Sequence, residues 1–284
     1  MENLNVNDLS PKEIAEKVVE VGCTKAKLPF FKMLVLAILA GVYIGFGGEL
    51  ATMISHDLKI GVGFTQFLAG SVFSVGLMLV VIGGAELFTG NNLMITACLH
   101  GKAKVSGLLK NWGTVYLGNF IGGVLLALLM FMAGLWKFND ASLGLKAVTI
   151  ANAKVNLSFL EAFSRGILCN WLVCLAVWLA FGSRNIVGKI FAIYFPIMAF
   201  VASGFEHSIA NMYFIPYGLF IKSSILSKFA TSSSVQLPNL ANLTWGNFFI
   251  KNLLPVTIGN IVGGAFFVGT IYWYVYLKEG SLKK

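Results

Sequence analysis

Six long apolar stretches constrain this chain more than any other feature of its sequence. They cover residues 33–54, 64–99, 108–136, 157–181, 187–221 and 248–277. A helix needs about 20 apolar residues to cross a bilayer. Only 12% of the residues carry a charge, about half of the roughly 25% that is usual in soluble domains. Because so few charges cannot cover a water-exposed surface, the sequence predicts an all-α protein that crosses a lipid bilayer several times.

Two of the stretches have the wrong length for a single continuous span. A helix over 64–99 would be about 54 Å long at 1.5 Å per residue, yet neither it nor 187–221 has room for two spans and a loop. Each stretch contains glycine and places a glutamate five residues before an asparagine; these residues are Gly84, Glu86, Asn91, Gly204, Glu206 and Asn211. Unpaired backbone groups are costly in hydrocarbon. We therefore expect both spans to break here, with the four Glu and Asn side chains bonding the freed backbone groups.

The two breaks belong to a longer repeat. Leu109-Lys110-Asn111 is followed by Gly118-Asn119, and Ile250-Lys251-Asn252 is followed by Gly259-Asn260 at the same spacing. The offset is 141 residues here and 120 residues between the breaks, and the polar segment 222–246 accounts for the difference. Three spans per repeat would make the second repeat run inverted through the membrane. Inverted repeats with paired broken helices are typical of transport proteins with a site near the midplane.

The expected organisation has five parts. Residues 1–32 form an amphipathic N-terminal helix that begins at the capping box Ser10-Pro11-Lys12-Glu13 and lies at the membrane surface or docks on the protein body. Residues 33–136 form the first three-helix repeat and 157–277 the second. Residues 137–156 form a connecting loop, and 278–284 a C-terminal tail.

Basic residues are distributed unevenly around the predicted spans. Thirteen Lys and Arg residues flank the span ends on the side that carries both termini, against seven on the other side. Because cytoplasmic loops carry the excess of basic residues, we expect both termini in the cytoplasm. Arg165 is left over inside a span. The chain has no basic helix or aromatic-basic strand motif, so the net charge of +9 does not indicate nucleic-acid binding.

The polar groups at the breaks are the candidates for function. Catalytic and nucleotide-binding motifs are absent, so we expect neither an enzyme nor a cofactor, and the four cysteines form no metal-binding pair. His207 lies in the middle of an apolar stretch, and an ionisable residue there is a functional hypothesis by default. Thr89 lies at the other break. A hydroxyl and an imidazole at the start of two half-helices, where backbone N–H groups are free, could hold a small anion.

These segments resemble the formate/nitrite transporter family. The likeness rests on the run from Phe205 to Pro216, on Ala85 to Asn91 and on Ser10 to Ala15, while Leu253 to Asn260 is similar to the formate-channel branch. The resemblance implies an aquaporin-like protomer with six spans, the second and fifth broken. It also implies a homopentamer in a bacterial-type inner membrane, with one pore in each protomer.

The resemblance also implies roles for individual residues. His207 and Thr89 would form the centre of the substrate pathway. Phe73 and Leu77 would line the cytoplasmic constriction, and Leu87 and Phe200 the outer one. Lys154 would attract anions in the outer vestibule.

Formate is the expected substrate, crossing with a proton that the anion accepts at the centre. Nitrite, hydrosulfide and acetate stay open as other substrates of the same family. An aquaporin-type channel for neutral solutes would need Asn-Pro-Ala at both half-helix starts, and Asn-Pro does not occur in this chain. A membrane scaffold without transport would not require a histidine between two helix breaks.

Overall fold

The described part of the chain, residues 8–230 and 237–278 of a computed structural model, is helical throughout and contains no strand. Five segments are long and apolar enough to cross a membrane: α2 (Phe30–Ser55), α3 (Val62–Gly83), α6 (Val105–Met132), α8 (Phe159–Gly182) and the segment Trp245–Tyr276. A shorter apolar helix, α9, covers Ile186–Ala202. These lengths confirm the prediction of an all-helical membrane protein.

Both predicted helix breaks are present. Helix α3 ends at Gly83, and the chain restarts as α4 (Phe88–Asn91), η1 (Asn92–Met94) and α5 (Ile95–Leu99). Helix α9 ends at Ala202, and α10 (Ser208–Phe229) follows after a turn at residues 203–204 and three residues without regular structure. Gly84 and Gly204 leave the first helices with φ of 84° and 72°. Glycine adopts this left-handed conformation without a steric penalty, and it marks the place where each span stops.

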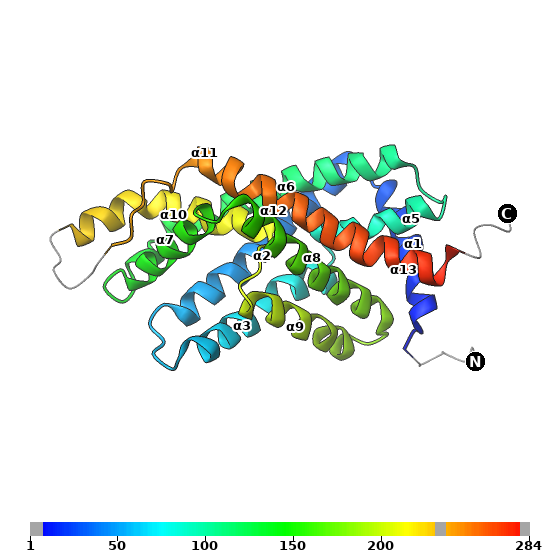
Figure 1. Ribbon diagram of the computed structural model, residues 1–284, viewed down its shortest axis with the longest axis horizontal. Helices are drawn as coiled ribbons and strands as arrows, with labels where there is room; N and C mark the ends of the chain where they lie inside the picture. The colour runs from blue at the N-terminus through cyan, green and yellow to red at the C-terminus, as the bar shows by residue number, and fades with distance from the viewer. Residues whose placement is uncertain (1–7, 231–236, 279–284) are drawn as a thin grey trace.

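Helix α1 (Pro11–Ala26) docks on the protein body. The predicted capping box forms, because Ser10 and Glu13 bond each other's backbone N–H. The hydrogen bonds that the Glu13 carboxylate accepts from Ser10 lower the pKa of the Glu13 carboxyl. Ile14, Val18 and Gly22 are buried against η1, α5 and α8. In Figure 1, α1 lies beside α13 (Ile271–Tyr276) at the right-hand end of the molecule.

The connecting segment is not a loop, contrary to the prediction for 137–156. After a short turn, η2 (Leu135–Lys137), it forms α7 (Ser142–Val155), which packs along α10. Five apolar or small residues on one face of α7 are buried: Leu143, Ala147, Val148, Ala151 and Val155. Their spacing is helical, and the face becomes stable only against α10. Helix α10 also extends into the polar segment 222–246 as far as Phe229. Of the predicted tail, residues 279–284 lie outside the described residues.

The last membrane segment changes helix type along its length. It runs through α11 (Trp245–Asn247), η3 (Phe248–Leu253), α12 (Leu254–Ile261), η4 (Val262–Thr270) and α13, and both η3 and η4 are π-helical. Pro255 has no N–H to donate, and the hydroxyl of Thr270 bonds the carbonyl of Ala265, five residues earlier. Helix α6 occupies the matching place in the first repeat without such irregularity.

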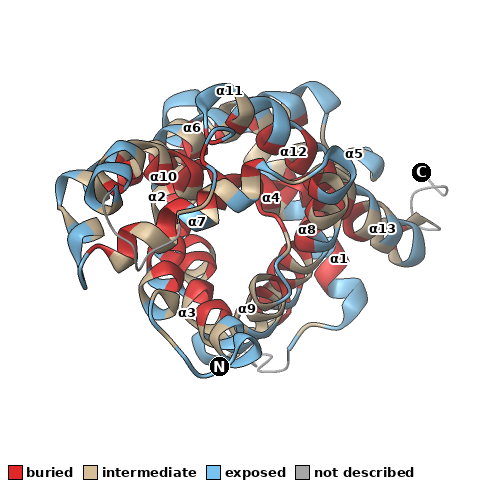
Figure 2. Cartoon of the chain, turned by 60° about the vertical axis from the view of Figure 1, so that its left-hand side comes forward, coloured by how far each residue is buried: buried red, intermediate tan, exposed pale blue. Residues whose placement is uncertain are grey.

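Glycines let two pairs of helices cross closely. A Cβ at Gly122 of α6 would lie 2.0 Å from the Ile38 carbonyl oxygen on α2, and one at Gly263 would lie 2.2 Å from that of Ile167 on α8. Small residues at such crossings are typical of membrane helices, because packing drives their association. Figure 2 shows the buried residues where these helices face α4 and α10.

Candidate functional site

The side chains of Thr89 and His207 meet in the protein interior. Thr89 Oγ1 and His207 Nε2 are 2.8 Å apart, and both residues are buried. His207 caps the start of α10, where its Nδ1 accepts the Ala210 N–H at 3.1 Å. Because Nδ1 is the acceptor, a neutral ring carries its proton on Nε2 and donates it to Thr89. The threonine hydroxyl then keeps its own proton for another acceptor.

Two asparagines hold the backbone at the breaks. Asn119 on α6 accepts the Phe88 N–H at 2.9 Å and donates to the carbonyls of Glu86 at 2.9 Å and Ala37 at 2.7 Å. Asn260 on α12 accepts the Ser208 N–H at 2.9 Å and donates to the carbonyls of Glu206 and Gly166. One asparagine side chain thus satisfies two backbone groups at each break and bonds one carbonyl of a neighbouring helix, α2 or α8.

The four predicted break-stabilising side chains do something different. Asn91 donates to the Glu86 carboxylate at 2.7 Å and to Asn111 at 2.8 Å. Asn211 donates in the same way to Glu206 and Asn252, at 2.7 Å each. Within the described residues these carboxylate and amide groups bond side chains, so the expectation that they bond the freed backbone was wrong. The repeated Gly-Asn spacing around Asn119 and Asn260 was the signal for the residues that do so.

Each carboxylate at a break forms a buried ion pair. Glu86 pairs with Lys25 of α1 at 2.5 Å, and Glu206 pairs with Lys154 of α7 at 2.8 Å. Lys154 therefore lies in contact with the second break. Lys25 was missed, although it stands in the last turn of the helix that the capping box predicts. Lys154 also lies 5.3 Å from the ring centroid of Phe214.

Two cavities open next to the central pair. The first has a volume of about 280 Å³ and is lined by Lys25, Glu86, Leu77 and Leu87, among others. The second has a volume of about 270 Å³ and is lined by Lys154, Glu206 and His207, among others. We call them the Lys25 cavity and the Lys154 cavity.

The four predicted constriction residues divide differently between the two sides than the resemblance implied. Phe73 and Phe200 both line the Lys154 cavity, and their rings meet edge to face with centroids 5.7 Å apart. Leu77 and Leu87 both line the Lys25 cavity. The expected pairs, Phe73 with Leu77 and Leu87 with Phe200, were wrong. Phe73 and Leu77 are one turn apart on α3 and reach opposite sides of the centre.

The Lys154 cavity contains two further basic residues, Lys146 of α7 and Arg165 of α8. Burial lowers the pKa of the Lys146 ammonium, so an anion beside it would compensate for lost hydration. The wall of the Lys154 cavity therefore carries an excess of positive charge, and the rings of Phe73 and Phe200 are also part of it.

A family model described as formate/nitrite transporter matches residues 12–274. The chain belongs to the formate/nitrite transporter family. A probable formate transporter of Methanothermobacter thermautotrophicus is 44% identical over 289 residues, which cover 95% of this chain and 98% of that protein. The formate channel FocA of Escherichia coli K12 is 40% identical, and the match covers 96% of each protein.

Solved structures give the same result for the fold. A pentameric formate channel with formate bound superposes with a TM-score of 0.78 at 39% identity, covering 88% of this chain and 98% of that one. An ion channel of the same family has a TM-score of 0.80 at 30% identity, with 93% and 98% covered. These relatives are transporters and channels rather than enzymes.

Proposed function

We propose that this protein is a membrane channel for formate, which passes between the Lys25 and Lys154 cavities through the Thr89–His207 pair. The hydrogen bond between Thr89 and His207, at 2.8 Å, carries the proposal, because His207 lines the Lys154 cavity while Gly90, which follows Thr89, lines the Lys25 cavity. Membership of the family and the names of its relatives as formate channels select the substrate.

The proposed architecture is six membrane spans in two inverted three-helix repeats, with the second and fifth spans broken. Matched hydrogen bonds at the two breaks support the repeat. We propose a homopentamer, since the solved relative is described as pentameric. The excess of basic residues near α1 and after α13 supports a plasma-membrane orientation with both termini in the cytoplasm.

The mechanism follows from the cost of moving a bare anion through apolar rings, which is very large. Lys154 draws formate into its cavity. At the centre, Thr89 donates its hydroxyl proton to a formate oxygen in a hydrogen bond, while His207 holds Thr89 in place. Formate accepts a proton there, from His207 or from water through it, and passes Leu77 and Leu87 as neutral formic acid.

The test is formate uptake into proteoliposomes, measured against pH for the unchanged protein and for His207→Phe. We expect the unchanged protein to transport more formate as pH falls and the variant to lose that dependence. An unchanged pH profile in the variant would exclude His207 from the proton route. Parallel uptake of nitrite and hydrosulfide tests the substrate, because faster transport of either would overturn the choice of formate.

A further inference from the structure

The Lys154 cavity has more positive than negative charge. Three basic residues line it, Lys146, Lys154 and Arg165, against one acidic residue, Glu206. Glu206 is fully engaged, because its carboxylate accepts from Lys154 at 2.8 Å, Asn211 at 2.7 Å and Asn252 at 3.2 Å. The charges of Lys146 and Arg165 are therefore left without compensation from the cavity wall.

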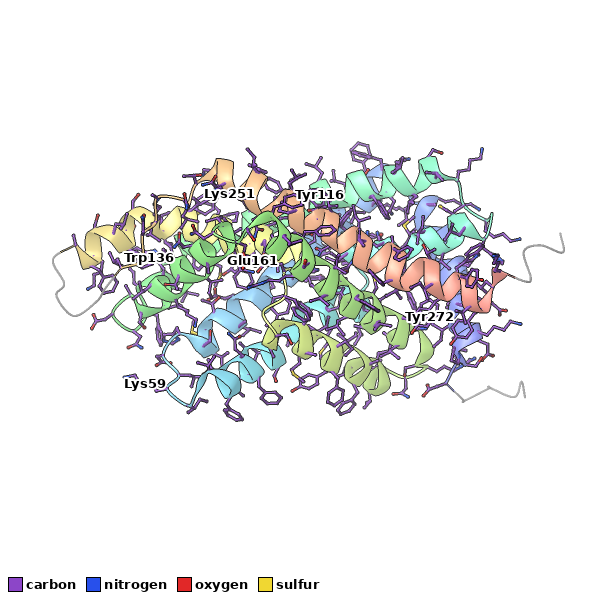
Figure 3. All side chains as sticks on the ribbon, viewed as in Figure 1. Lys59, Tyr116, Trp136, Glu161, Lys251 and Tyr272 are labelled. Carbon is purple, nitrogen blue, oxygen red and sulfur yellow. The ribbon has the colours of Figure 1, made fainter. Side chains whose placement is uncertain are left out.

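Within the part of the chain that the structure describes, no carboxylate oxygen lies within 4.0 Å of the side-chain nitrogens of Lys146 or Arg165. Glu161 stands one turn before Arg165 (Figure 3), but its exposed carboxylate accepts the Ser158 N–H at 2.8 Å and hydroxyl at 2.7 Å. Both basic residues are only partly exposed. A partly desolvated cation without a direct ion pair favours an anion beside it.

The Lys25 cavity has no counterpart of these two basic residues. The offset of 129 residues that relates Lys25 to Lys154 also relates Lys17 to Lys146 and Leu36 to Arg165. The backbone confirms the match, since the carbonyls of Leu36 and Arg165 accept the Glu86 and Glu206 N–H groups at 3.2 Å each. Lys17 is exposed and paired with Glu20 at 2.8 Å, and Leu36 has no charge.

We propose that Lys146 and Arg165 form a carboxylate-binding site in the Lys154 cavity, distinct from the Thr89–His207 pair, which makes this side of the channel prefer carboxylates to spherical anions. The guanidinium is a planar fork that offers two parallel N–H donors to one carboxylate, whereas an ammonium acts as a point charge. Formate matches the fork and chloride does not. The inference rests on the proposed function, because the site loads the substrate that the centre passes.

The test is tracer exchange of formate in proteoliposomes at equal concentrations on both sides, so that the direction of insertion does not matter. The variants are Arg165→Gln, Arg165→Lys and Lys146→Gln. The control is Lys59→Gln, which removes an exposed charge from the loop between α2 and α3, outside the cavity (Figure 3). Half-saturation by formate, maximal exchange rate and inhibition by chloride are measured for each.

We expect Arg165→Gln and Lys146→Gln each to raise the half-saturating formate concentration about fivefold, the size of one partly exposed charge-assisted contact. The maximal rate should stay constant and Lys59→Gln should change nothing. Arg165→Lys should keep the inhibition by chloride but raise half-saturation by formate about threefold, because the charge remains and the fork is lost.

Two results would overturn the inference. If Lys59→Gln raised the half-saturating formate concentration as much as the cavity variants do, diffuse surface charge would explain the effect. If Arg165→Lys left that concentration unchanged, the planar guanidinium would not be what recognises formate. If the unchanged protein exchanges no formate above empty vesicles, the proposed function fails instead. If the elution volume in size-exclusion chromatography and the thermal unfolding show that one Gln variant does not assemble, Arg165→Lys and the other Gln variant still test the inference.

Discussion

The two halves of this protein use the same polar groups to hold their backbones and different groups for chemistry. Asn119 and Asn260 make the same three hydrogen bonds, and Lys25 and Lys154 make the same ion pair. At the Thr89–His207 pair the halves differ, because Leu87 matches His207, and Thr89 matches Ile209 at the offset of 120 residues. Each half thus supplies one member of a single pair.

This difference separates two kinds of constraint. A broken helix in hydrocarbon needs its backbone groups satisfied wherever it occurs, so both halves keep the asparagines. The pathway centre that we propose needs one hydroxyl and one imidazole, and two copies would leave extra polar groups without partners. The halves are therefore alike in structure and unlike in chemistry, and the following substitutions test that division.

The largest effect is expected from Asn119→Leu and Asn260→Leu. Each leaves two buried backbone groups at a break without partners and should destabilise the folded protein by on the order of 4 kcal/mol, so that little assembled protein is recovered. Yield and thermal unfolding in detergent measure the effect. Asn247→Leu, which removes one exposed hydrogen bond, is the control. If one half tolerated the loss, the equivalence of the two asparagines would be wrong.

A smaller loss is expected from Lys25→Met and Lys154→Met. Each leaves a buried carboxylate without its partner, at about 3 kcal/mol, and the matching Glu86→Gln or Glu206→Gln should restore thermal stability in the double variant. Transport should then distinguish the sides, since only the Lys154 side keeps two further cations in its cavity. A double variant that stayed as unstable as the single one would contradict this reading of the pairs.

The centre can be exchanged between the halves. Leu87→His with His207→Leu should lower formate uptake about tenfold, because the hydrogen bond between Thr89 and His207 is lost. Adding Thr89→Ile and Ile209→Thr rebuilds the pair in mirror image and should recover part of the uptake. The same proteoliposome assay measures both proteins. No recovery in the fourfold variant would show that the surroundings of the centre are not equivalent.

The smallest effect concerns size selection. Phe73→Ala widens the Lys154 side and Leu77→Ala the Lys25 side, and each should raise the ratio of acetate to formate uptake roughly threefold as the apolar contact is lost. Equal ratios would mean that both sides restrict passage. A change in Phe73→Ala alone would assign size selection to the Phe73–Phe200 contact.

Much of this could be predicted from the chain. Glycine next to Glu and Asn inside 64–99 and 187–221 located both breaks, because polar residues are rare in hydrocarbon unless they have a role. Helix α7 was missed because Lys146, Thr149 and Asn152 separate the residues of its buried face along the sequence, so that the segment contains no long apolar run. That face is stable only because α10 covers it.

The lengths of the apolar spans, the positions of the two breaks and the relation between the halves can all be read from the chain, because they follow from local composition and spacing. The contact of Phe73 with Phe200 and the ion pair of Lys25 with Glu86 emerge from the packing of the helices. These contacts join helices far apart in the chain, and their partners depend on the rotation and crossing of each helix, which no local pattern encodes.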